Sequence, residues 1–200
     1  GLTATVLANP ARREVVAAFG GTTSGRKVGT HLAARFQPGK NARTSLSQWG
    51  TNVKAGLGRT PRSYAQAAEL VARLQENIRT RPEYQGYRLR TVGHSKGGGE
   101  ATYAALRQAE PVPATVFCPW HLSDGLLRQL PTANLDRAKT LVQSYAPYGD
   151  PVAALRGSLP GIHGVGREFR FEGIKGSNPI DLHDQFLKHL VHYCERARRA

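Results

Sequence analysis

The sequence is poor in several features that would define other classes of protein. It has no methionine and only two cysteines, Cys118 and Cys194, which are too few for a disulfide-stapled scaffold. No run approaches the roughly 20 apolar residues that a membrane-spanning helix needs. With Gly1 as first residue, the lack of methionine predicts a processed chain or an excised domain, in which a signal peptide would not be visible.

Acidic residues are also scarce. The 200 residues contain 14 Asp and Glu against 28 Lys and Arg, a formal net charge of +14. From Gly20 to Ala68 there are eight basic residues and no acid. This balance favours an anionic partner, which could be nucleic acid, an acidic membrane surface or an acidic protein. The length and the 40% hydrophobic content predict a single folded domain, 1–200.

Several motifs of metal, phosphate and nucleic-acid sites are missing. There is no H-E-x-x-H or C-x-x-C spacing and no P-loop, although a calcium site is left open. The basic stretch has only Phe36 and Trp49 as aromatic rings, so it offers no ladder on which bases could stack. We therefore expect no cofactor, no catalytic metal and no nucleic-acid partner.

Short runs of β-forming residues alternate with helical patterns along the chain. The expected strands cover 14–19, 87–92, 112–117, 141–145 and 167–172, and the expected helices cover 63–73, 100–108 and 182–198. Thr60 is the expected N-cap of the first helix. This alternation predicts an α/β fold with a mainly parallel sheet and flanking helices. Residues 25–57 fit neither pattern and predict a basic, lid-like insert.

The most specific motif is the pentapeptide Gly93-His-Ser95-Lys-Gly97, between a predicted strand and a predicted helix. On a sharp strand-to-helix turn the Ser95 hydroxyl would be exposed, and the two glycines would let strand and helix approach closely. The N–H of Lys96 would point at a developing oxyanion near the helix N-terminus. The motif therefore predicts a serine nucleophile, although a chance match in a glycine-rich loop is the alternative.

Two segments carry a family resemblance. Gly93-His-Ser95-Lys-Gly97-Gly resembles the G-H-S-x-G-G elbow of class 3 lipases, which are α/β-hydrolases. The run from Val15 to Thr22 is similar to that family's V-V-x-F-R-G-T/S segment, with Gly20 where the family has Arg. The resemblance implies an α/β-hydrolase fold, a lid in the region 25–57, and Thr22 as the first oxyanion-hole residue.

A serine nucleophile needs a base and an orienting acid, which follow it in the order acid, histidine in α/β-hydrolases. Asp150 follows a predicted strand and resembles the family's D-x-V-P segment, so it is the candidate acid, with Asp124 and Asp136 as fallbacks. His183 precedes Asp-Gln-Phe-Leu in a predicted loop opening the last helix, which resembles the family's H-x-x-x-Y/F-L ending. His183 is the candidate base, and His163 is the alternative.

The remaining histidines carry no catalytic assignment. His94, next to the nucleophile, is expected to be a packed residue of the elbow. His189 and His192 lie within the last predicted helix and are expected to be surface or packing residues.

Together, the residues and the resemblance predict a serine carboxylic-ester hydrolase that cleaves acyl lipids, above all a phospholipase or lipase working through an acyl-enzyme. The basic insert favours an anionic membrane surface, at about 1 kcal/mol per Lys or Arg near it. An acidic inhibitor or immunity protein is a second expected partner, and a secreted bacterial effector is the favoured setting. The alternatives are an esterase or thioesterase for a soluble acyl substrate, and an inactive module that binds membrane or nucleic acid.

Overall fold

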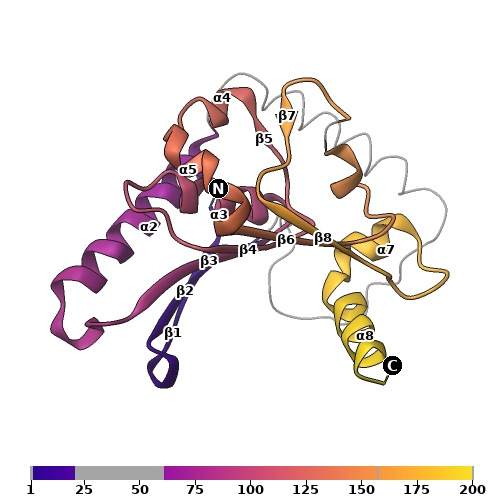
Figure 1. Ribbon diagram of the computed structural model, residues 1–200, viewed down its shortest axis with the longest axis horizontal. Helices are drawn as coiled ribbons and strands as arrows, with labels where there is room; N and C mark the ends of the chain where they lie inside the picture. Colours follow the sequence, from indigo (N-terminus) through magenta and orange to yellow (C-terminus); the bar gives the residue numbers. More distant parts are fainter. Residues whose placement is uncertain (1, 21–60, 157, 200) are drawn as a thin grey trace.

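A six-stranded sheet organises the computed structural model, which describes residues 2–20, 61–156 and 158–199. The strand order is β1-β2-β3-β4-β6-β8; β1 runs antiparallel to β2, and the other neighbouring pairs are parallel (Figure 1). The strands of this sheet are β1 (Ala4–Asn9), β2 (Glu14–Phe19), β3 (Arg88–His94), β4 (Ala114–Phe117), β6 (Val142–Pro147) and β8 (Arg167–Phe171). A separate two-stranded sheet pairs β5 (Leu122–Ser123) with β7 (Ile162–His163).

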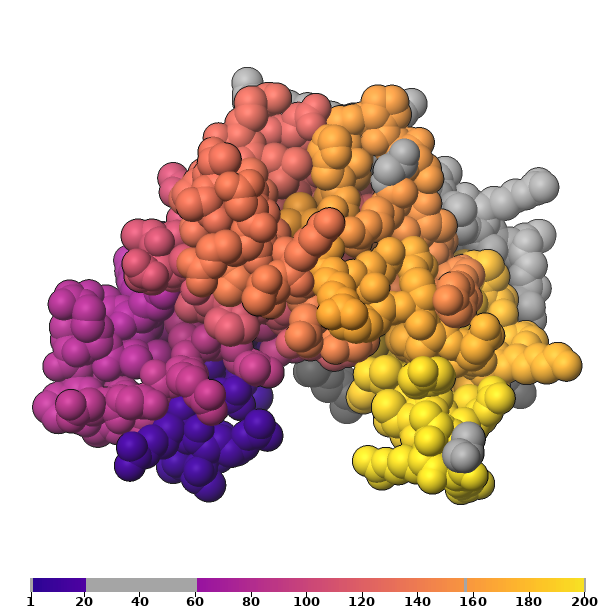
Figure 2. Space-filling view, in the orientation of Figure 1, coloured from indigo at the N-terminus to yellow at the C-terminus, as the bar shows by residue number. Residues whose placement is uncertain are grey.

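Helices cover both faces of the large sheet. The helices α2 (Arg62–Thr80) and α3 (Lys96–Leu106) pack together on one face, and α8 (Phe186–Arg199) lies on the other (Figure 1). The shorter helices are α4 (Asp124–Leu127), α5 (Thr132–Asp136), α6 (Ala138–Leu141), α7 (Pro179–Asp184), η1 (Pro10–Arg12), η2 (Pro82–Tyr84) and η3 (Ala153–Leu155). Figure 2 shows the β1–β2 hairpin, in indigo, and α8, in yellow, projecting from the lower side of the molecule with a gap between them. No helix in the described ranges is long and apolar enough to cross a membrane.

The core forms where α3 crosses the sheet. Ten of the eleven residues of α3 are buried, because its glycines and alanines let the helix backbone approach the strands closely. In β2, Val15, Ala17 and Phe19 are buried in alternation, as expected of a strand whose inner face contacts the helices.

The parallel register places three chain segments at one edge of the sheet. His94 of β3 pairs with Phe117 of β4, which in turn pairs with Tyr145 of β6. The carboxyl ends of these strands therefore lie side by side, and the residues that follow them share one edge. Sites in open α/β sheets form at this edge.

The predicted α/β fold with a mainly parallel sheet is confirmed. The strand predicted at 14–19 is found with the same bounds, and the other four predicted strands are found within about two residues of their bounds. The helix α2 continues to Thr80, well past the predicted end. The helix α3 begins at Lys96 rather than Glu100, because glycines that usually disfavour helix are required there for close packing.

The prediction of one continuous C-terminal helix is wrong. The chain forms α7 and then α8, with a break at Gln185, so His183 lies in a helix and not in a loop. The sequence contains a recognisable signal for the start of α7. Asn178 caps the helix by accepting a hydrogen bond from the Asp181 N–H, and Pro179 occupies its first turn.

The strand β1 was not predicted. All six of its residues are exposed, so it lacks the buried alternation by which strands are recognised. Thr60, Thr22 and the basic insert 25–57 lie outside the described residues. The assignment of 1–200 to a single domain stays a prediction.

Candidate active site

Ser95 occupies a strained turn between β3 and α3. Its φ of 55° and ψ of −125° define a region that residues other than glycine rarely enter. The Ser95 N–H donates to the Phe117 carbonyl at 3.0 Å, and the Ser95 carbonyl accepts from the Trp120 N–H at 2.8 Å. Because the segment at the end of β4 binds both the N–H and the carbonyl of Ser95, the turn keeps the strand-to-helix shape of a nucleophile elbow.

The two glycines of the pentapeptide are required by space. A Cβ on Gly93 would lie 2.2 Å from the carbonyl oxygen of Gly97. A Cβ on Gly97 would lie 2.2 Å from the carbonyl oxygen of Phe19. No side chain fits at either position, so the role predicted for these glycines is confirmed.

The side chain of Lys96 is engaged by a buried acid. Its ammonium forms an ion pair with Glu100, which is fully buried one turn further along α3. Burial, and after it the negative charge of Glu100, raises the pKa of Tyr64 beneath the helix. Lys96 is also the first residue of α3, where N–H groups have no carbonyl partner within the helix. The backbone N–H of Lys96, rather than its ammonium, is therefore suited to the oxyanion role.

The fold brings the predicted acid and base together. The Nδ1 atom of His183 lies 2.7 Å from Oδ2 of Asp150, and both residues are buried. Asp150 follows β6, and His183 lies on α7, which packs against the same strand. A carboxylate in this position fixes the tautomer of the imidazole and leaves Nε2 to exchange a proton.

The Asp150 carboxylate has three hydrogen-bond donors. Besides His183, the Ala153 N–H donates to Oδ1 at 2.7 Å, and the Cys118 thiol also donates. Burial on its own would raise the pKa of Asp150, but the hydrogen bonds and the charge of His183 outweigh burial and lower it. The carboxylate is therefore ionised at neutral pH.

Sequence reasoning missed Cys118. This fully buried residue follows β4 with a φ of 44°, and its N–H donates to the Tyr145 carbonyl at 2.8 Å. Burial, and after it the negative charge of Asp150, raises the pKa of the thiol, so it stays protonated and can donate. The only clue in the sequence was its place at the end of a predicted strand.

His94 is packed, as the sequence predicted. Its ring stacks on Phe186 at a centroid distance of 4.5 Å, and Nε2 lies 2.9 Å from the carbonyl oxygen of His183. Burial, followed by the nearby charge of His183, lowers the pKa of His94 to about 4. A neutral His94 therefore joins the elbow to the segment that carries His183.

One cluster of potential metal ligands occurs among the described residues. His94, Cys118 and His183 place possible ligand atoms within 4.8 Å of one another. A metal would need the Cys118 thiolate, whereas burial keeps this thiol protonated and directed at Asp150. His94 and His183 also have hydrogen-bond partners. These three side chains are therefore better suited to hydrogen bonding around Asp150 and His183 than to binding a metal ion.

The alternative residues pair with each other. His163 Nε2 lies 2.6 Å from Asp124 Oδ1, and both side chains are about half exposed. The β5–β7 pairing brings them together in the small two-stranded sheet. Asp136 ends α5, so the two fallback acids and the alternative base occupy other parts of the fold. His189, in contrast, is fully buried and interacts with Asp181.

One protein family matches most of the sequence. A sequence model of the Tle-like phospholipase domain, described as phospholipase-like, matches residues 3–177. The chain belongs to this family. The matched part of the Tle-like domain includes Ser95 and Asp150, whereas His183 lies just beyond it. The more specific resemblance to class 3 lipases stays a prediction, and a comparison with curated proteins gives no match.

Two solved structures resemble the Tle-like domain at low identity. A mutant of MDLA from Penicillium cyclopium aligns with a TM-score of 0.49 and 20% identity, covering 88% of this chain and 61% of that one. Acyl-protein thioesterase 2 from Zea mays aligns with a TM-score of 0.35 and 16% identity, covering 66% of each chain. The chain thus spans about two thirds or less of the length of these proteins. The description of its fold therefore rests on its own strand order and not on these alignments.

Proposed function

We propose that this Tle-like domain is a serine carboxylic-ester hydrolase that acts on acyl lipids, with phospholipid preferred. Membership of a phospholipase-like family indicates a lipase- or esterase-type hydrolase. The observation that carries the serine mechanism is the buried 2.7 Å hydrogen bond between His183 and Asp150, in a fold that also holds Ser95 on a strained elbow. The packing of His94 against Phe186 and the His183 carbonyl supports a common site.

The proposed reaction has two halves. The Ser95 oxygen attacks the ester carbonyl while His183 Nε2 accepts the hydroxyl proton, and this proton then passes to the departing alcohol as the acyl-enzyme forms. Water attacks the acyl-enzyme in the same way, returning the proton to Ser95 and releasing the fatty acid. Throughout, Asp150 stays ionised and holds the Nδ1–H of His183.

The oxyanion of each tetrahedral intermediate needs fixed N–H donors. The start of α3 at Lys96 supplies one N–H in this proposal, and the favourable end of the helix dipole adds to it. Thr22 is the proposed second group. Removing one such donor costs about 100- to 1,000-fold in turnover in other hydrolases.

The preference for phospholipid depends on charge. The formal net charge of +14 and the acid-free basic run from Gly20 to Ala68 suit an anionic bilayer. The same charge suits an acidic inhibitor protein, which we propose as a second type of partner. Neither partner is needed for the serine chemistry, so substrate and mechanism are tested separately.

The mechanism is tested with a fluorophosphonate probe, which labels activated serines. The wild-type protein should be labelled and Ser95→Ala should not. Ser158→Ala, which changes an exposed serine that donates to the Ala154 carbonyl, should label like wild type. Equal labelling of wild type and Ser95→Ala would refute Ser95 as the nucleophile, and labelling of neither protein would favour the inactive binding module.

The substrate class is tested with matched esters. Hydrolysis should be faster on vesicles containing phosphatidylglycerol than on pure phosphatidylcholine vesicles, and the advantage should shrink as salt is raised because the attraction is electrostatic. Activity confined to short p-nitrophenyl esters would instead identify an esterase for soluble acyl substrates.

A further inference from the structure

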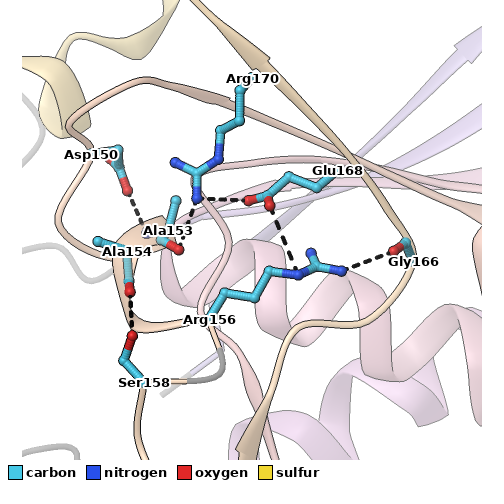
Figure 3. Close-up of polar contacts among 8 residues, drawn as sticks. All are labelled: Asp150, Ala153, Ala154, Arg156, Ser158, Gly166, Glu168 and Arg170. Atoms are coloured by element: carbon cyan, nitrogen blue, oxygen red, sulfur yellow. Dashed lines mark hydrogen bonds and ion pairs between the residues drawn. The ribbon is translucent and has the colours of Figure 1, made fainter.

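The loop that carries Asp150 is fixed at Ala153. The Ala153 N–H donates to Asp150 Oδ1 at 2.7 Å, and the Ala153 carbonyl accepts from the Arg170 guanidinium at 2.9 Å (Figure 3). Ala153 itself is buried. Its backbone therefore links the proposed catalytic acid to a charged side chain on β8.

Arg170 is held in place by an ion pair with Glu168, which in turn pairs with Arg156. Its guanidinium lies 3.0 Å from Glu168 Oε1, and the other oxygen of Glu168 lies 3.8 Å from Arg156 Nε (Figure 3). Arg156 also donates to the Gly166 carbonyl at 3.1 Å. These three side chains are at most 30% exposed, so the network is less screened by solvent than a surface ion pair.

The network ties the acid loop to β8 at two places. Ala153 connects to Arg170 within the loop, and Arg156 connects to Glu168 just after η3. His121 adds a further contact, since its buried ring lies against the backbone of Val152 and Ala153. Burial, and after it the charge of Arg156, lowers the pKa of His121 to about 4, so this contact is made by a neutral ring.

We infer that Arg170 is a positioning residue for the proposed hydrolysis. By holding the Ala153 carbonyl, it keeps the Ala153 N–H on Oδ1 of Asp150 and so leaves Oδ2 directed at His183. Arginine suits this task because one guanidinium bonds a carbonyl and a carboxylate at once, with fixed geometry. The inference rests on the proposed function, because it assigns Asp150 a catalytic part.

The test compares Arg170→Gln with Arg167→Gln on the same strand. Arg167 lies over the Phe169 ring at 4.9 Å and serves as the matched control. With p-nitrophenyl butyrate, Arg170→Gln should lower kcat about 10- to 100-fold, the scale expected for a misplaced catalytic group, and leave KM within about twofold. Arg167→Gln should stay close to wild type. Equal kcat values in the two variants would overturn the inference.

A double-mutant cycle separates positioning from general stability. The rate of fluorophosphonate labelling of Ser95 is measured for Arg170→Gln and Arg170→Lys, each with and without Asp150→Asn. The Lys variant keeps a cation beside Glu168. It therefore serves as the test variant if thermal melts show that the Gln variant is unstable. Arg170 variants should slow labelling when Asp150 is present and have no further effect in Asp150→Asn.

The opposite outcomes are equally clear. Slowing by the same factor in both backgrounds would show a structural role independent of Asp150 and overturn the inference, as would wild-type labelling in both Arg170 variants. Failure of the serine mechanism itself would appear separately, as full turnover by Ser95→Ala.

Discussion

Burial of His94 should make the stability of the protein depend on pH. In the folded protein its pKa is lowered to about 4, from an ordinary value of 6.5, mainly by burial and then by the nearby charge of His183. The hydrogen bond to the His183 carbonyl, and after it the negative charge of Asp150, act in the opposite direction and raise this pKa. In the unfolded chain, His94 is expected to titrate near 6.5.

The sign and size follow from proton linkage. Between pH 6.5 and 4 the unfolded chain binds a proton at His94 that the folded protein does not, so stability is complete above pH 6.5 and is lost as pH falls. The pKa values 6.5 and about 4 differ by about 2.5, which at 1.36 kcal/mol each corresponds to roughly 3 kcal/mol in total. Between pH 7.5 and 5 the expected loss is about 2 kcal/mol.

The perturbation is His94→Gln, which removes the titrating ring and keeps an N–H donor for the His183 carbonyl. Free energies of unfolding from urea titrations at pH 7.5, 6.5, 5.5 and 5.0 measure the slope. Wild type should lose about 2 kcal/mol more than His94→Gln over this range. His121, which is also neutral and buried, contributes equally to both proteins and cancels in the difference.

A pH-independent control guards against a mere loss of stability. Val71→Ala, at a fully buried site on α2, should lower the free energy of unfolding by a similar amount at every pH and keep the wild-type slope. Parallel curves for wild type and His94→Gln would refute the reasoning, since they would mean that His94 binds its proton equally in the folded and unfolded states.

Two further predictions concern the elbow and the base. Gly97→Ala, whose Cβ would lie 2.2 Å from the Phe19 carbonyl oxygen, should lower the free energy of unfolding by roughly 3 kcal/mol or more and reduce Ser95 labelling. Gly125→Ala, with its nearest neighbour at 3.7 Å, should be neutral or stabilising in the same urea titrations. His183→Gln should abolish ester turnover, whereas His163→Gln should keep most of it. The reverse ranking in the turnover assay would transfer the base role to His163.

Local sequence was sufficient where the chemistry is local. The elbow could be predicted because its glycines and serine are consecutive and lie between recognisable elements. Asp150 could be proposed because loops after parallel strands present functional groups, and Pro151 helped to mark that loop. In the same way, the period-two burial of β2 was visible as an apolar run.

Contacts between distant segments could not be predicted in this way. Cys118 and Arg170 lie far from Asp150 in the chain, and nothing in their flanking residues indicates that Cys118 approaches Asp150 or that Arg170 bonds the nearby Ala153 carbonyl. The break at Gln185 was also missed, because the apolar spacing of α8 continues smoothly back into α7.

The sequence by itself determined the α/β class, the strand-to-helix turn at Ser95 and the strong positive charge, because each depends on composition or on neighbouring residues. Only the tertiary structure decided that Asp150 pairs with His183 rather than with another histidine, and that His163 belongs with Asp124. The physical reason is the packing of elements that are far apart in the chain. The parallel sheet fixes where β6 ends and Asp150 follows, α7 packs against β6 and brings His183 to that carboxylate, and the separate antiparallel β5–β7 pair holds His163 beside Asp124.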